Sequence, residues 1–190
     1  MSTDGEREWF LPAEFLDVLS TARRRVTVVG VLASVFGVFG LAYMLGLAAH
    51  GFSGPVTMVK VGFLGAHAVG MGIGLGLLNH SGGARSAGSV WFVAWGVVNL
   101  IVGFAALDAE DPLLGLFTFV TGAIHLLFSA VLNSAEIVFL CDYVGPDITE
   151  EATRKGLQAA LAGGTVEMQV FANSVINPLP PAAVPPDDAP

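Results

Sequence analysis

The sequence predicts an all-α, polytopic membrane protein whose core is a four-helix transmembrane bundle. Residues 26–141 carry few charged side chains, and these divide the segment into four apolar runs, 26–49, 55–78, 90–107 and 113–140. Each run meets or approaches the roughly 20 residues that a helix needs to span about 30 Å of hydrocarbon. The charged residues in this segment are Lys60, Arg85, Asp108, Glu110, Asp111 and Glu136.

Composition leaves little room for a second domain. The chain has 190 residues, of which 54% are hydrophobic, and its mean hydropathy is +0.71. We expect a cytoplasmic N-terminal segment at 1–25 with an amphipathic helix, the four-span domain at 26–141, a short helix and an irregular segment at 142–176, and a disordered tail at 177–190.

The placement of lysine and arginine predicts the orientation. Positively charged residues near membrane spans tend to stay on the cytoplasmic side. Seven of the eight fall on one side of the predicted spans, and only Lys60 does not. We therefore expect a multi-pass protein of the cell membrane with both termini in the cytoplasm. The seven are Arg7, Arg23, Arg24, Arg25, Arg85, Arg154 and Lys155.

A signal peptide is the competing interpretation of the first run, because an arginine cluster precedes it. The apolar part of a signal peptide has about 7–15 residues, whereas residues 26–49 form an uncharged run of 24. The length favours a membrane span.

Before the first span, apolar residues recur on one helical face, with Leu11, Phe15 and Leu19 separated from Glu14 and Asp17. This pattern predicts a short interfacial helix lying along the cytoplasmic leaflet before the chain turns into the first span. A plain cytoplasmic lead-in is the alternative.

After the spans, Asp147 and Glu150 resemble a capping box, and a helix is expected from there to Gly163 and Gly164. Residues 165–171 alternate apolar and polar side chains and fit either a strand or a continued helix. The tail 177–190 holds six prolines in fourteen residues, which is typical of extended or disordered chain.

The second span shows a packing pattern, since Gly62, Ala66, Gly70 and Gly74 recur every four residues. Small residues at this spacing let helix backbones approach closely. We expect the second span to be the central helix of the bundle.

Polar residues inside the spans are the functional candidates, because they are costly in hydrocarbon. His67, Asn99 and His125 fall near the centres of the second, third and fourth spans. If the fourth span is one helix, its other polar residues share a face with His125. The sequence thus predicts a transport pathway formed by Lys60, His67, Asn99, His125, Ser129, Asn133 and Glu136.

Such a ladder is typical of a proton relay or of a narrow polar permeation path. In the alternative interpretation each polar group only satisfies a neighbour, and Lys60 and Glu136 extend to opposite interfaces. His67 and His125 at equal depth could also hold a haem b between two imidazoles. No other cofactor and no metal site is expected.

We therefore expect a channel or transporter for a small solute or protons, acting as a homo-oligomer because four helices alone enclose little pore. The alternatives are a non-catalytic subunit or assembly factor of a larger membrane complex, and a haem-based electron-transfer protein. Enzyme activity is not expected, since no catalytic or nucleotide-binding motif occurs and Cys141 is the only cysteine. The net charge of −8 argues against nucleic acid or an anionic lipid surface as a partner, leaving the bilayer and other membrane subunits.

Overall fold

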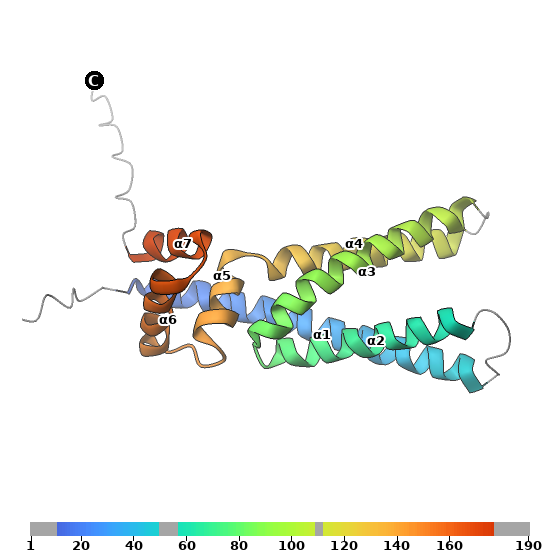
Figure 1. The fold of residues 1–190 in the computed structure, drawn as a ribbon, viewed down its shortest axis with the longest axis horizontal. Coiled ribbons are helices and arrows are strands. Elements are labelled where there is room, and N and C mark those ends of the chain that lie inside the picture. The colour runs from blue at the N-terminus through green and yellow to red at the C-terminus, as the bar shows by residue number, and fades with distance from the viewer. Residues whose placement is uncertain (1–10, 50–56, 109–111, 177–190) are drawn as a thin grey trace, which may run out of the picture.

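The computed structural model describes residues 11–49, 57–108 and 112–176, and within these ranges the chain is helical with no strand (Figure 1). Four long helices come first and a group of short ones follows. The long helices are α1 (Ala13–Ala49), α2 (Thr57–Leu78), α3 (Gly82–Asp108) and α4 (Pro112–Leu132). The short ones are α5 (Ala135–Phe139), the π-helical turn η1 (Leu140–Val144), α6 (Glu150–Gly163) and α7 (Val166–Ile176).

The four long helices are long and apolar enough to cross a membrane, over Ala13–Tyr43, Val61–Leu78, Gly82–Asp108 and Gly115–Leu132. Many of their large apolar side chains point outward, among them Phe39, Phe104 and Phe117. An outward-facing apolar surface of this kind is favourable in hydrocarbon and unfavourable in water. The surface pattern therefore agrees with the predicted class of four apolar spans.

The long helices pair as two hairpins, α1 with α2 and α3 with α4, and contacts between the hairpins are fewer. Glycines allow the close approach within each pair. Gly74 of α2 lies directly against Ser34 and the Gly30 carbonyl of α1. In the second hairpin, a Cβ at Gly96 would lie 3.1 Å from the Gly122 carbonyl, and one at Gly122 would lie 3.0 Å from the Gly96 carbonyl.

This pairing differs from the predicted arrangement around a central second span. Of the four small residues in that pattern, Gly74 is in tight contact and Ala66 is buried. A Cβ at Gly70 would have only the Trp91 Nε1 atom within 4 Å, at 3.8 Å, and a Cβ at Gly62 would have no atom within that distance among the described residues. The regular spacing thus spans both a packed and an open part of α2.

The N-terminal amphipathic segment does not turn before the first span, because α1 is one continuous helix (Figure 1). Its apolar face is buried by protein: Phe15 and Leu19 pack with Phe139, Leu157 and Met168. The prediction of a separate helix lying along the leaflet is therefore wrong. The amphipathic face serves instead as the docking surface for the short helices, which together with the start of α1 form a cap at one end of the molecule.

In the cap, α6 begins and ends close to the predicted positions, but Thr149 is its N-cap residue. The Thr149 hydroxyl accepts a hydrogen bond from the Ala152 N–H at 3.1 Å. Residues 165–171, for which strand and helix were both open, belong to helix α7. Within 142–176 the chain is thus mostly helical, and residues 145–149, between η1 and α6, are its longest non-helical part.

The fourth apolar run is not one helix. α4 ends at Leu132, Ser134 has extended backbone angles (φ −65°, ψ 142°), and α5 begins at Ala135. Asn133 and Ser134 have short side chains that compete for backbone hydrogen bonds, which favours a break at this point. The apolar residues beyond the break belong to the cap and not to the span.

Several predictions concern residues outside the described ranges. They are the loop at 50–56, the centre of the acidic turn at 109–111, and the proline-rich tail at 177–190. Lys60 belongs to α2, but its side chain also lies outside the described part of the structure.

We expect Gly74→Ala to destabilise the α1–α2 hairpin by about 1–3 kcal/mol, because the added Cβ overlaps Ser34 and the Gly30 carbonyl. Gly62→Ala is the matched control in the same helix and should be neutral or stabilising, since alanine favours helix and the space is open. Thermal unfolding in detergent measures both variants. Equal midpoints for the two would contradict the hairpin contact.

Candidate functional site

The polar residues of the predicted ladder separate into two groups in the structure. Ser129 and Asn133 follow His125 along one side of α4 and its C-terminal turn, in the interface with α3. His67 lies in the interface of α2 with α1 and α3. The two groups have different neighbours.

His125 has a defined protonation pattern when its ring is neutral. Its Nδ1 lies 2.7 Å from the Thr121 carbonyl oxygen of the preceding turn. A carbonyl oxygen only accepts, so Nδ1 must carry the hydrogen and Nε2 keeps its lone pair. Phe92 and Phe128 surround the ring, with centroid distances of 5.8 and 6.3 Å. Nε2 of His125 can therefore receive a proton or a hydrogen bond in a mostly apolar setting.

On the cap side of His125, a polar cluster links α4 to α3. The Ser129 hydroxyl donates to the Ser89 carbonyl at 2.9 Å, and the Asn133 amide donates to the Ser89 hydroxyl at 2.7 Å. The same Asn133 amide donates to the Ser129 carbonyl at 3.0 Å. Residues four apart are neighbours on a helix, spaced by about 6 Å. We call His125, Ser129, Asn133 and Ser89 the polar row.

The polar row leads to an ion pair at the cap end of the spans. Arg85 Nη2 lies 2.8 Å from Asp142 Oδ2, and Arg85 Nε donates to Asp142 Oδ1 at 3.1 Å. A third nitrogen, Nη1, donates to the Leu132 carbonyl at 3.4 Å, at the end of α4. Arg85 is thus buried, and two of its guanidinium nitrogens bond the two oxygens of the Asp142 carboxylate. It lies one helical turn from Ser89 on α3.

Sequence reasoning used Arg85 only as an orientation signal and missed its partner. Asp142 is 57 residues away in η1, where the wider π turn follows α5. Gly82 adjoins the same carboxylate, since a Cβ there would lie 2.5 Å from Asp142 Oδ1. The available signal was a lone arginine at the start of the third span and a lone aspartate just after the fourth.

His67 fills a notch in the first hairpin. Its ring lies directly over Gly40 of α1, where a Cβ would overlap the ring, and it contacts Trp95 of α3 edge-on at 6.4 Å. Trp95 in turn stacks on Trp91 with centroids 5.8 Å apart. The Asn99 amide donates to the Trp95 carbonyl of its own helix at 2.8 Å.

These contacts bear on the continuous ladder through Asn99 and on the haem interpretation. Asn99 bonds within α3, and the hydrogen bonds of the described residues do not join it to His67 or His125. The two imidazoles pack against different aromatic side chains of α3, Trp95 and Phe92. Such packed rings are typical of histidines that fill a helix interface, which weakens the haem alternative.

Glu136 does not share the helical face of His125. The break at Asn133 and Ser134 places it in α5, where it is half-buried at the edge of the cap. The predicted face shared with His125 is therefore not formed, because that prediction assumed an unbroken fourth helix.

On the other side of His125 the α3–α4 interface is closed. Gly96 faces Gly122, and Leu100 and Leu126 fill the space beside them. Further along, Gly103 and Gly115 repeat the close approach. The polar row therefore extends from His125 to the cap end. Beyond His125 this interface also holds the buried Thr118, whose hydroxyl donates to the Gly115 carbonyl of its own helix at 3.0 Å.

The turn between α2 and α3 holds a strained residue. His80 has φ 53°, is buried, and its Nε2 has no hydrogen-bond partner within the described structure. Burial, and secondly the positive charge of Arg23, lower the pKa of His80.

In the cap, burial raises the pKa of the Cys141 thiol to about 11, so this cysteine is an unreactive core residue at neutral pH.

Across residues 11–49, 57–108 and 112–176, no group of three or more His, Cys, Asp or Glu side chains could hold a metal ion. No protein-family model, no curated protein and no solved structure matches this chain.

We expect Arg85→Gln to destabilise the protein by about 2–3 kcal/mol, because it leaves the Asp142 carboxylate without its two charged hydrogen bonds. Arg154→Gln is the control, since it removes the exposed pair with Glu150 and should cost only about 0.5 kcal/mol or less. Both are measured by thermal unfolding in detergent. Additive losses in Arg85→Gln and Asp142→Asn, with no coupling in the double variant, would contradict the pairing.

The pH dependence of stability should depend on His80. Its pKa in the folded state lies below the ordinary value of 6.5, so the unfolded chain binds the proton more readily. Stability from the neutral ring is present above about pH 6.5 and is lost as the pH falls below that value. His80→Asn tolerates positive φ and does not titrate, so its unfolding midpoint should fall less than that of the parent between pH 7.5 and 5.5. Parallel pH profiles would contradict this assignment.

Proposed function

We propose that this chain is a multi-pass membrane protein that moves protons or a small polar solute across the bilayer as a homo-oligomer, without catalysing a reaction. The observation that supports this most directly is the polar row, which runs from His125 in mid-span to the Arg85–Asp142 pair. Polar groups inside a span are costly and are typical of proton or substrate pathways.

The distribution of charge supports the orientation. The start of α1, the α2–α3 turn and the cap lie at the same end of the molecule (Figure 1). Apart from Lys60 near the start of α2, the basic residues of the described helices belong to these segments. They are the three arginines of α1, Arg85 on α3, and Arg154 and Lys155 on α6. By the positive-inside rule this end is cytoplasmic. Both termini are then on the cytoplasmic side of the cell membrane.

The chemistry of the row suits a proton or a small solute with hydrogen-bonding groups. Hydroxyls and a neutral imidazole both donate and accept, so they can exchange partners without a net change of charge. The row begins at the neutral Nε2 of His125 and continues through hydroxyl and amide groups toward the cap. Each step replaces part of the hydration that the permeating species loses.

The closed part of the α3–α4 interface is the reason to propose an oligomer. Gly96 and Gly122 leave no room for a solute beyond His125 in that interface. The remainder of the path must then use another surface, either between the two hairpins or between copies of the chain. Outward-facing apolar residues on all four spans provide surface for association in the bilayer.

A second candidate function is a non-catalytic subunit or assembly factor of a larger membrane complex. The supporting observation is on α7, outside the four spans, where Val166 and Val170 are 76% and 63% exposed. Residues four apart lie on one helical face, so these two form an apolar strip on the cap. Such a strip fits contact with another protein.

Transport is tested with protein reconstituted in liposomes. His125→Ala and Asn133→Leu should each reduce proton flux to the level of empty liposomes, because each interrupts one step of a series pathway. Thr121→Val and Glu136→Gln are matched controls that lie off the row and should keep the flux of the parent. Expression and oligomer size should be unchanged in all four.

Urea, small amides and short carboxylates are assayed in the same liposomes. An absence of flux above empty liposomes with all of these and with protons would contradict the transport proposal. Retained flux in both row variants would show that the path lies elsewhere. In the first case, association tests on a Val166→Ser/Val170→Ser variant would examine the second candidate.

A further inference from the structure

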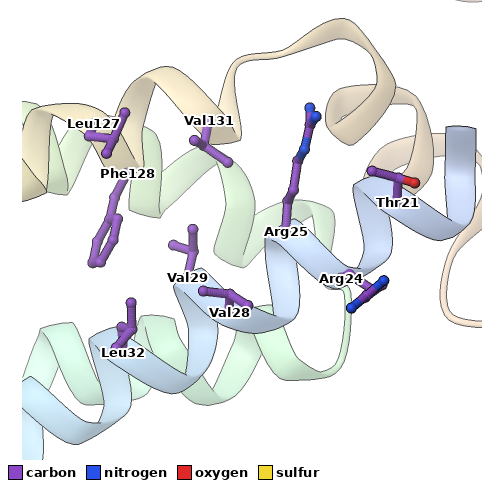
Figure 2. Close-up of a pocket in the computed structure, with 9 residues that line it drawn as sticks. All are labelled: Thr21, Arg24, Arg25, Val28, Val29, Leu32, Leu127, Phe128 and Val131. Atoms are coloured by element: carbon purple, nitrogen blue, oxygen red, sulfur yellow. The ribbon is translucent and has the colours of Figure 1, made fainter.

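We propose that the cleft between α1 and α4 binds an anionic phospholipid, with the acyl chain in the cleft and the phosphate at Arg24 and Arg25. The cleft has a volume of about 460 Å³, within the range of small-molecule sites. Figure 2 shows its lining, which comes from α1 on one side and α4 on the other. The two helices make few direct contacts, so the cleft separates one hairpin from the other.

The walls of the cleft are apolar. Val29 and Leu32 of α1 lie opposite Phe128 and Val131 of α4 (Figure 2). From Thr21 to Leu32 the α1 wall extends for about 16 Å, calculated from the helical rise. Val28 and Leu127 at the rim are 56% and 61% exposed, so the cleft opens sideways toward the space that lipid occupies around a membrane protein. An extended hydrocarbon chain fits this shape.

The polar end of the cleft carries two positive charges. Arg24 and Arg25 are exposed, and neither forms an ion pair with any residue in the described ranges. By contrast, Arg85 and Arg154 each have a carboxylate partner. In Figure 2 the Arg25 side chain rises from α1 toward the connection that follows α4. Two unpaired guanidinium groups beside an apolar cleft suit a ligand with a phosphate next to a hydrocarbon chain.

The local charge is opposite to the net charge of the chain. A net charge of −8 disfavours a general attraction to anionic membrane surfaces. The positive groups at this cleft therefore favour recognition of individual lipids over binding to a whole charged surface. Basic sites between membrane helices at the cytoplasmic side are typical positions for anionic lipid headgroups.

The chemistry separates an anionic phospholipid from other ligands. Inorganic phosphate would leave the apolar walls unoccupied, and a zwitterionic headgroup adds a cation that the arginines repel. This inference depends on insertion of the chain in a membrane, as proposed above, but not on transport. A lipid-binding measurement can therefore fail or succeed independently of the flux assay.

Native mass spectrometry of the detergent-purified protein provides the test. Phosphatidylglycerol and phosphatidylcholine with identical acyl chains are compared, and we expect phosphatidylglycerol to be retained preferentially. Each arginine near an anionic group contributes roughly fivefold in affinity. Arg24→Gln and Arg25→Gln should each lower phosphatidylglycerol binding by about this factor, and the double variant by about twenty-five-fold.

Two further variants make the test specific. Arg23→Gln removes the same charge from the adjacent position, which does not line the cleft, and should keep the affinity within about twofold. Val28→Trp fills the cleft from an exposed position and should reduce binding of the lipid without changing any charge. Its unfolding midpoint should match that of the parent.

Three results would overturn the proposal. The first is equal retention of phosphatidylglycerol and phosphatidylcholine by the parent protein. The second is unchanged binding in the Arg24→Gln/Arg25→Gln variant or an equal loss in Arg23→Gln. The third is full competition by inorganic phosphate or glycerol phosphate, which would show that the arginines bind a soluble anion and that the apolar cleft takes no part.

Discussion

Close backbone contact at glycine positions is the constraint from which the arrangement of the long helices follows. Gly74 brings α2 against α1, and Gly96 with Gly122 brings α4 against α3. Hydrocarbon outside the helices is as apolar as their side chains, so the hydrophobic effect does not drive such pairs together. Dispersion contacts and the match of the two surfaces hold them instead. Two stiff hairpins result. The α1–α4 cleft exists because these hairpins pack more tightly inside than against each other, whereas the polar row lies within the second hairpin.

The hairpins are joined chiefly at the cap end. There Val26 and Leu77 of the first hairpin share a buried apolar cluster with Phe92 and Leu132 of the second. At the same end the Arg85–Asp142 pair connects the start of α3 to η1, and Arg85 also reaches the last turn of α4. A buried ion pair contributes little net stability when compared with apolar packing, yet either charge alone would be costly. The pair therefore fixes which segments meet at this end more than it strengthens their contact. Cys141, which precedes Asp142 in η1, is buried in the same region.

The sequence was a good guide to the long apolar helices, because their signal is local and strong. It was a poor guide to interfaces. The four-residue spacing in α2 identifies small residues but does not tell which of them meets another helix, so Gly62 and Gly74 could not be distinguished. The break after Asn133 was hidden because apolar residues continue past it. The partner of Arg85 lies 57 residues away, and no local pattern encodes that distance.

The interfacial helix was mispredicted for a related reason. Its amphipathic face does exist, but a face that fits the surface of a bilayer fits the apolar side of α5, α6 and α7 equally well. Only the tertiary structure shows which of these covers Phe15 and Leu19. Of the candidate site, the succession of His125, Ser129 and Asn133 along one side of the fourth span was predictable, and the closure at Gly96 was not.

The unbroken length of α1 has a mechanical consequence. Its 37 residues form a rod about 55 Å long, held at one end by the cap and along the rest by α2. A rod of that length acts as a lever, so a tilt of about 5° at the cap displaces the opposite end by about 5 Å. Any ligand that shifts α6 or α7 against Phe15 would therefore displace the opposite end of α1, with no flexible joint between them.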